Sequence, residues 1–216
     1  MDRDQVLQKM IDCGVVAVLR AKSSAELLDV SKALYEGGVT SIEVTMTTPG
    51  ALKVIEEVAR KMSGQVIVGV GSVLDGETAR AAILAGAEFV VGPVFKESAM
   101  EVAKSHGKVI IPGAFSPTEI LRAWEAGADV VKVFPATAVG PKYFRDLLGP
   151  FPQLRLTPTG GVMVENIGEF IKAGAVFVGA GTSLVDIKAV SEKRFDVITE
   201  TARRMVGEVR KARGLQ

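Results

Sequence analysis

One short segment recurs along this chain at nearly even spacing. Its clearest copies are Leu84–Val91, Glu125–Lys132 and Lys172–Gly179, each with Ala-Gly-Ala followed by a mostly apolar run, and Glu36–Glu43 is a weaker fourth copy. The copies lie about 41–48 residues apart, which is the length of two strand-plus-helix units and not of one. They therefore mark every second strand, and a fourfold repeat of a double βα unit predicts a (β/α)8 TIM barrel.

Short β-branched runs alternate with amphipathic segments from one end of the chain to the other. Several runs are apolar without interruption, which is typical of parallel strands that helices cover on the outside. Eight strands are predicted: Val15–Leu19, Ser41–Val44, Val66–Val70, Glu88–Val91, Val109–Ile111, Val130–Val133, Arg155–Leu156 and Val176–Val178.

Helix start and stop signals lie between these strands. Ser23–Glu26 and Ser116–Glu119 have the pattern of capping boxes, the second with proline at the first helical position. An additional N-terminal helix over residues 4–12 is expected to plug the bottom of the barrel, and a final helix over residues 192–212 ends in basic residues that suit its dipole. Glycines stand where helices are expected to turn into strands: Gly38, Gly86, Gly127 and Gly174.

Length and composition agree with one barrel domain over residues 1–216. Hydrophobic residues make up 48% of the chain, which is ample for a large core, and no linker or low-complexity segment divides it. The alternative α/β architecture, an open doubly wound sheet, is expected to have a glycine fingerprint after its first strand. Leu19-Arg20-Ala21-Lys22 stands there instead, so a single barrel is preferred.

Composition also argues against several classes of function. The net charge of +1 gives no basic footprint for nucleic acid, and no apolar run approaches the roughly 18 residues of a membrane span. The N-terminus lacks the apolar core of a signal peptide, so a cytoplasmic protein is expected. Cys13 and His106, the only residues of their kinds, are interpreted as a buried thiol and a solvated helix-end residue. No metal and no other cofactor are expected.

Lys132 is the most informative residue at the C-terminal ends of the strands, where such barrels have their active sites. It stands among Val130, Val131, Val133 and Phe134, and the two-residue period of a strand turns it toward the barrel interior. Burying an ammonium is costly unless it is paired or loses its proton. A neutral amine attacks carbonyls, so Lys132 is predicted to be a nucleophile. The alternative is a buried Lys–Glu pair that only stabilises the barrel.

Glu43 faces the same interior by the same alternation. Ser41 shares its side of the strand, whereas Ile42 and Val44 face the helices. A carboxylate near the lysine can move protons to and from a substrate, so Glu43 is predicted to be a general acid/base. The alternative is a purely structural counter-ion. Asp129 stands at the N-terminal end of its strand and is expected at the barrel bottom.

Glycines and hydroxyl groups follow the last two strands, in Thr159-Gly160-Gly161 and Gly179-Ala180-Gly181-Thr182. Glycine lets backbone N–H groups approach an anion, and these two loops are the usual phosphate site of (β/α)8 barrels. A phosphate site is therefore predicted here, and tight turns without a ligand are the alternative.

Four segments in this order resemble the 2-keto-3-deoxy-6-phosphogluconate (KDPG)/4-hydroxy-2-oxoglutarate (KHG) aldolases. They are Glu43–Thr45, Pro112-Gly113 with Ser116–Glu119, Lys132–Ala136 and Pro158–Val162, and the resemblance covers nearly the whole chain. It implies a class I, metal-independent Schiff-base aldolase, commonly a homotrimer, that makes or cleaves a pyruvate adduct. It also implies roles for individual residues: Schiff-base formation for Lys132, acid/base catalysis for Glu43, a pyruvate pocket lined by Ser72, Pro93 and Phe134, and phosphate binding by Thr159, Gly160, Gly161, Gly181 and Thr182.

The chain departs from the family pattern at three places. Many members have an arginine four residues after the glutamate, where it binds the pyruvyl carboxylate, but this chain has Thr47 there. Arg20, inward by the alternation of the first strand, is predicted to supply the charge, because a guanidinium binds a carboxylate from either side of a pocket. Gly92-Pro93-Val94 and Ser72 also differ from the usual family residues, which leaves the exact substrate open.

The leading hypothesis is cleavage of KDPG to pyruvate and glyceraldehyde 3-phosphate. A close alternative is an aldolase for KHG or a non-phosphorylated 2-keto-3-deoxy acid. Further alternatives are a phosphosugar isomerase or epimerase that uses Glu43 as its base, and a non-catalytic barrel that senses a phosphometabolite.

Overall fold

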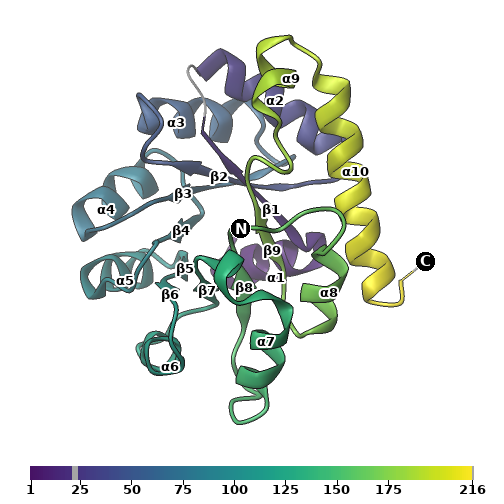
Figure 1. Cartoon of the computed structure of the whole chain (residues 1–216). Coiled ribbons are helices and arrows are strands. Elements are labelled where there is room, and N and C mark those ends of the chain that lie inside the picture. Colours follow the sequence, from purple (N-terminus) through teal and green to yellow (C-terminus); the bar gives the residue numbers. More distant parts are fainter. Residues whose placement is uncertain (21–23, 216) are drawn as a thin grey trace.

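The computed structural model describes residues 1–20 and 24–215, which form a ring of parallel strands surrounded by helices (Figure 1). The strands are β1 (Val15–Leu19), β2 (Ser41–Thr45), β3 (Ile67–Gly71), β4 (Phe89–Val91), β5 (Val109–Ile111), β6 (Gly113–Ala114), β7 (Val131–Val133), β8 (Leu156–Pro158) and β9 (Val178–Ala180).

The strands follow the order of a closed barrel. One sheet runs β5-β4-β3-β2-β1-β9 and the other β6-β7-β8, and neighbouring strands in both sheets are parallel. β5 and β6 are two halves of the fifth barrel strand, separated at Pro112, which has no N–H to donate to a ladder. Bridges from Leu156 to Ala175 and from Thr159 to Gly179 join β8 to β9. The predicted (β/α)8 fold is confirmed.

The predicted strands agree with the observed ones to within a residue at each end up to β7. The last two begin later than expected, at Leu156 and Val178 instead of Arg155 and Val176. For β9 the reason is its register: Val178 lies opposite Val15, the first residue of β1, so the apolar residues before it have no partner on that side.

The helices lie outside the ring, apart from the first. They are α1 (Arg3–Cys13), α2 (Ser24–Glu36), α3 (Ala51–Lys61), α4 (Gly76–Leu84), α5 (Glu97–Ser105), α6 (Pro117–Glu125), the short 3-10 helix η1 (Ala136–Ala138), α7 (Gly140–Leu148), α8 (Ile167–Lys172), α9 (Ile187–Ser191) and α10 (Phe195–Ala212).

The helix-end signals have mixed outcomes. The capping box of Ser116 and Glu119 is present, whereas the one predicted at Ser23 lies outside the described residues. The expected final helix over residues 192–212 is wrong in its first turn, because α9 ends at Ser191 and Lys193 adopts a left-handed φ of 55° before α10 begins. The four turn glycines all have φ between 91° and 107°, as predicted.

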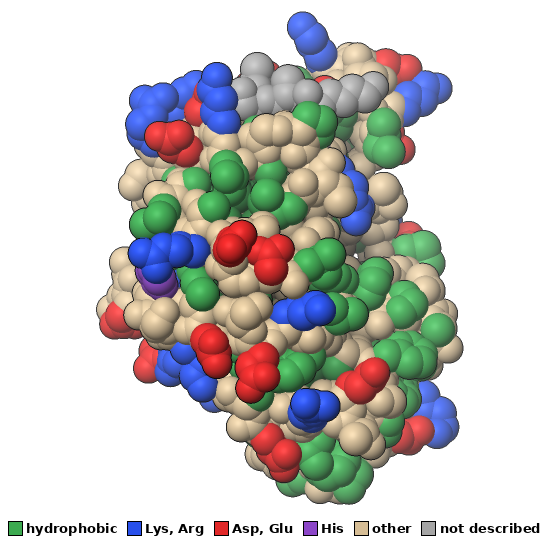
Figure 2. All heavy atoms as spheres, turned by 90° about the vertical axis from the view of Figure 1, so that its left-hand side faces the viewer, with side chains coloured by type: hydrophobic (Ala, Val, Ile, Leu, Met, Phe, Trp, Pro, Cys, Tyr) green, Lys and Arg blue, Asp and Glu red, His purple; other side chains and the backbone are tan. Residues whose placement is uncertain are grey.

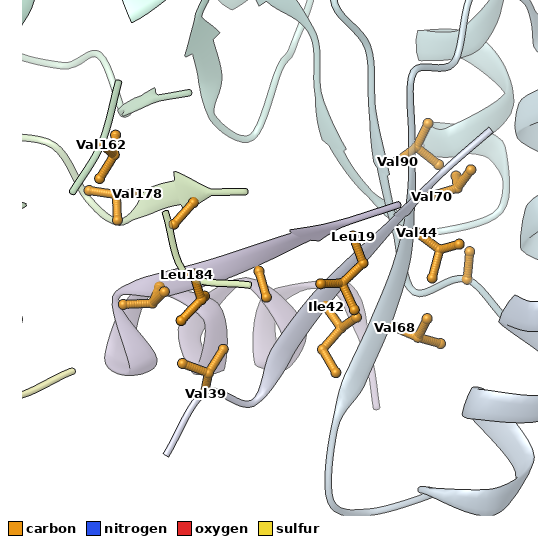
Figure 3. Packing of buried hydrophobic residues seen from close by; sticks show 14 of the residues in the cluster. Leu19, Val39, Ile42, Val44, Val68, Val70, Val90, Val162, Val178 and Leu184 are labelled. Atoms are coloured by element: carbon orange, nitrogen blue, oxygen red, sulfur yellow. The ribbon is translucent and has the colours of Figure 1, made fainter. Parts of the chain in front are cut away.

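Two hydrophobic layers hold the barrel together. Outward side chains of β1 to β4 pack under the helices; Figure 3 shows Leu19, Ile42, Val44, Val68, Val70 and Val90 among them. Inside the ring, Val6, Leu7 and Met10 of α1 pack against inward side chains such as Phe89 and Phe177. α1 therefore closes the barrel bottom, as predicted, and leaves the C-terminal ends of the strands for a site.

The surface over α4 and α5 has charges of both signs mixed with hydrophobic side chains (Figure 2). This face has no continuous basic stripe, in agreement with the net charge of +1. Within the described residues, every helix is too short or too polar to cross a membrane.

Candidate active site

The Lys132 side chain lies inside the barrel, 5% exposed, in the middle of β7. In the strand register Lys132 lies opposite Gly113 of β6 and Thr157 of β8. Its backbone N–H donates to the Pro112 carbonyl at 2.9 Å. Nζ stands 5.0 Å from the centre of the Phe134 ring, a cation–π distance. Lys132 has no ion pair among the described residues, which disfavours the buried Lys–Glu pair as its sole role.

Glu43 lies in β2, only 3% exposed, and faces the same interior. Burial raises the pKa of its carboxyl above the usual range, and the Lys132 and Arg20 cations oppose this by a smaller amount. The three charged side chains are therefore close enough to interact across the barrel mouth. A carboxyl that holds its proton to higher pH than usual can act as a proton donor as well as a proton acceptor.

Gly71, at the end of β3, makes the room that the Glu43 side chain occupies. A Cβ on Gly71 would lie 2.5 Å from Cδ and 2.7 Å from Cγ of Glu43 and would overlap Oε1. We did not identify this residue from the sequence. Gly71 directly follows the strand predicted over Val66–Val70, and a glycine at the end of a strand can indicate close approach by another group.

Arg20 and Thr47 stand at the neighbouring ends of β1 and β2. Arg20 is exposed and, with Gly181 and Thr182, lines a recess of about 290 Å³. The Thr47 hydroxyl lies 2.8 Å from Oγ1 of Thr45, which itself donates to the Leu19 carbonyl at 3.3 Å. Thr47 is thus held at the β1–β2 edge, beside the residue expected to replace the family arginine.

Ser72 follows β3, the neighbour of β2, whereas Pro93 and Phe134 follow β4 and β7. Ser72 adopts a left-handed φ of 61°, uncommon for a residue with a side chain and frequent at functional sites. Pro93 passes directly over Gly113, and a Cβ on Gly113 would overlap the Pro93 carbonyl group. Pro93, Gly113 and the 38%-exposed Phe134 line a second recess of about 290 Å³.

The two glycine-containing loops after β8 and β9 come together. Thr159 bridges to Gly179, and a Cβ at Gly179 would lie 2.5 Å from the Thr159 hydroxyl oxygen. Gly160 and Gly161 have φ of 95° and 71°, a conformation that residues with side chains rarely adopt. The structure therefore brings together the two segments predicted to hold a phosphate.

Other candidate side chains lie away from the mouth. Asp129 accepts a hydrogen bond from the Ile110 N–H at 2.9 Å and lies 3.7 Å from Arg3 of α1, at the barrel bottom as expected. His106 caps the C-terminus of α5, and Cys13 is half-buried instead of fully buried. Among the described residues, no three His, Cys, Asp or Glu side chains are grouped so that they could hold a metal ion.

Comparison with known proteins assigns the family. The model of the KDPG and KHG aldolase family matches residues 6–201. The chain belongs to this family. It is 34% identical to the 2-dehydro-3-deoxy-phosphogluconate aldolase of Treponema pallidum over 86% of this chain and 88% of that one.

Solved structures of related aldolases have the same fold. One described as a native KDPGal structure superposes with a TM-score of 0.86 at 27% identity, covering 93% of this chain and 96% of that one. A KDPG aldolase from Legionella pneumophila, with pyruvate captured as a covalent carbinolamine, superposes with a TM-score of 0.84 at 27% identity, covering 91% and 97%.

The mouth of this aldolase-family barrel has two chemically distinct regions. Pro93 and Phe134 line an apolar recess, with the Phe134 ring centre 5.0 Å from Nζ of Lys132, whereas the loops after β8 and β9 offer backbone amides and hydroxyls. An elongated ligand that spans the mouth would thus place a carbonyl near the amine of Lys132 and an anionic group at the glycine loops.

Proposed function

We propose that this protein is a class I aldolase that reversibly cleaves KDPG to pyruvate and glyceraldehyde 3-phosphate through a Schiff base on Lys132. The observation that carries the proposal is the buried amine of Lys132, without an ion-pair partner among the described residues, in the same interior as Glu43. Membership of the KDPG and KHG aldolase family supports the reaction class. The reaction needs no cofactor, because the lysine itself supplies the electron sink.

The reaction starts with attack of the Lys132 amine on the C2 carbonyl of KDPG. The carbinolamine loses water to give an iminium, and Glu43, through a water molecule, removes the proton of the C4 hydroxyl. The C3–C4 bond then breaks, its electron pair moves into the iminium to give an enamine, and glyceraldehyde 3-phosphate leaves. Protonation of the enamine at C3 and hydrolysis release pyruvate and the free amine.

The remaining residues bind the two ends of the substrate. Arg20 pairs with the pyruvyl carboxylate, with Thr47 beside it, because a guanidinium can hold both carboxylate oxygens. Ser72, Pro93 and Phe134 form the pyruvate pocket, and Thr159, Gly160, Gly161, Gly181 and Thr182 hold the phosphate. Arg20→Ala should raise KM for the keto acid strongly while Arg20→Lys restores part of it. An unchanged KM would exclude Arg20 from this role.

The whole chain, residues 1–216, acts as one catalytic domain in a cytoplasmic homotrimer. A similar chain, 27% identical with a TM-score of 0.86, occurs in a cage designed by fusing symmetric oligomeric domains. Val94 and Phe115, 47% and 40% exposed near the mouth, are apolar enough to be covered by a second copy. Sedimentation equilibrium should give three times the 22.8 kDa chain mass, and a monomer mass would refute the trimer.

Borohydride trapping tests nucleophile and reaction class together. Pyruvate with sodium borohydride should add mass to the peptide that contains Lys132 and abolish activity. Lys132→Met should be inactive from the start and should gain no mass. Lys142→Met is the matched control, because Lys142 is exposed and pairs with Asp146 at 2.6 Å. Absence of mass gain on Lys132, with substrate still turned over, would favour an isomerase or epimerase that uses Glu43 as base.

The second candidate is an aldolase for KHG or a non-phosphorylated 2-keto-3-deoxy acid, which the family description favours because it includes KHG aldolases. The ratio of kcat/KM for substrates with and without the 6-phosphate distinguishes the two. A ratio near one would favour the non-phosphorylated substrate.

A further inference from the structure

Asn166, just before α8, holds the loop that follows β8. Its Nδ2 donates to the Gly161 carbonyl at 2.8 Å, and its Oδ1 accepts from the Met163 N–H at 2.8 Å. One side chain thus closes the turn from both sides. The substrate-binding set predicted from the sequence did not include it.

Ser183 ties the same loop to the one after β9. Its Oγ donates to the Val162 carbonyl at 2.6 Å, and it directly follows Thr182. The residues that flank this link are anchored: Val162 and Leu184 are 2% and 1% exposed and belong to one hydrophobic cluster (Figure 3). The distance between the two loops is therefore fixed by the core below and by this hydrogen bond above.

These hydrogen bonds engage the carbonyl groups of Gly161 and Val162 and the N–H of Met163, and they leave the amides before Met163 open. Within the described residues, the N–H groups of Gly160, Gly161 and Val162 have no acceptor, and neither do those of Thr182 and Ser183. A peptide's C=O and N–H point in opposite directions, so fixing the Gly161 carbonyl on Asn166 also fixes the Val162 N–H. Successive open N–H groups form a concave anion site.

We propose that Asn166 and Ser183 are positioning residues for the substrate phosphate. Their hydrogen bonds to the carbonyl oxygens of Gly161 and Val162 keep these oxygens from repelling the anion. The same bonds keep the amides of both loops aligned toward one point. Neither side chain takes part in forming the Schiff base on Lys132. The inference rests on the proposed function, because it requires that a phosphorylated substrate be held by these loops.

Asn166→Asp is the sharpest variant. The aspartate keeps an oxygen for the Met163 N–H but replaces the donor to Gly161 with an oxygen that repels both the carbonyl and a phosphate. Loss of one such bond changes binding about two- to tenfold, so KM for KDPG should rise about tenfold in Asn166→Asp and about threefold in Ser183→Ala. Ser183→Thr, which keeps the hydroxyl, should restore the wild-type value.

The control readouts separate positioning from general damage. kcat/KM for non-phosphorylated 2-keto-3-deoxygluconate and borohydride trapping of pyruvate on Lys132 should stay unchanged in all these variants. Glu165→Gln is the matched control, since Glu165 is the exposed neighbour of Asn166 and pairs with Arg204 at 3.8 Å. It should behave as wild type with both substrates.

Two patterns would overturn the inference and can be told apart. Equal losses with both substrates, or no change in KM for KDPG, would leave the phosphate site standing but deny a positioning role to Asn166 and Ser183. If the wild-type protein itself does not distinguish the two substrates, the phosphate site of the proposed function fails and the positioning role fails with it.

Discussion

Gly71→Ala should disable catalysis by moving one carboxylate while leaving the barrel folded. Gly71 does not have a left-handed φ, so alanine is compatible with its backbone. The new methyl group would nevertheless lie 2.5 Å from Cδ of Glu43, where ordinary contact begins at about 3.4 Å. The Glu43 side chain must therefore retreat by about 1 Å.

A displacement of about 1 Å at a reacting group costs on the order of a hundredfold in rate, equivalent to ~2.7 kcal/mol of transition-state stabilisation. The upper bound is complete loss of general acid/base catalysis, about 10²–10⁴-fold. The affected quantity should be kcat for the cleavage step. Attack by Lys132 on pyruvate does not require the displaced carboxylate in its old position, so borohydride trapping should persist.

The assay is a double-mutant cycle with Glu43→Ala. Glu43→Ala removes the side chain that the new methyl group strikes, so Gly71→Ala should change neither kcat nor the free energy of unfolding any further in that background. Full additivity of the two substitutions, or wild-type kcat in Gly71→Ala, would refute the claim that Gly71 makes the room for the Glu43 carboxylate.

Three further predictions concern stability. Because burial raises the pKa of Glu43, the folded state keeps a proton that the unfolded state releases above about pH 4.3, so the ionisable carboxyl destabilises the fold at neutral pH. Glu43→Gln should therefore raise Tm at pH 7–8 in calorimetry and lose this advantage below about pH 4, and an equal Tm at pH 8 would contradict it. Gly207 lies on an exposed turn of α10, and a Cβ there would have no other atom within 4 Å. Gly207→Ala should therefore raise the free energy of unfolding in urea by ~0.5–1 kcal/mol, because alanine favours the helix more than glycine does. A lower urea midpoint would contradict this reason. Ser116→Ala removes the side-chain half of the capping box of α6 and should cost ~1 kcal/mol, which Ser116→Asp should largely recover; no loss in Ser116→Ala would show that the cap is dispensable.

The sequence alone determined the barrel and the inward direction of its central charges. Both depend on local regularities: the repeat marks every second strand, and the period of two in a strand assigns each side chain to one face. Lys132 and Glu43 could be assigned to the interior on this basis, and both are buried there. Local pattern does not specify helix ends that depend on tertiary contacts: α10 begins at Phe195, whereas the predicted helix began at residue 192.

Only the tertiary structure decided which residues meet across strands. That Gly71 accommodates Glu43, and Gly179 accommodates Thr159, depends on the register of neighbouring strands, which local pattern does not specify. The same holds for Arg20: it lies beside Thr182 because the ring closes with β9 next to β1, although the two residues are far apart in the chain. The links from Asn166 and Ser183 to the loop after β8 arise in the same way, since a hydrogen bond requires atoms within about 3 Å, and only the folded chain sets such distances.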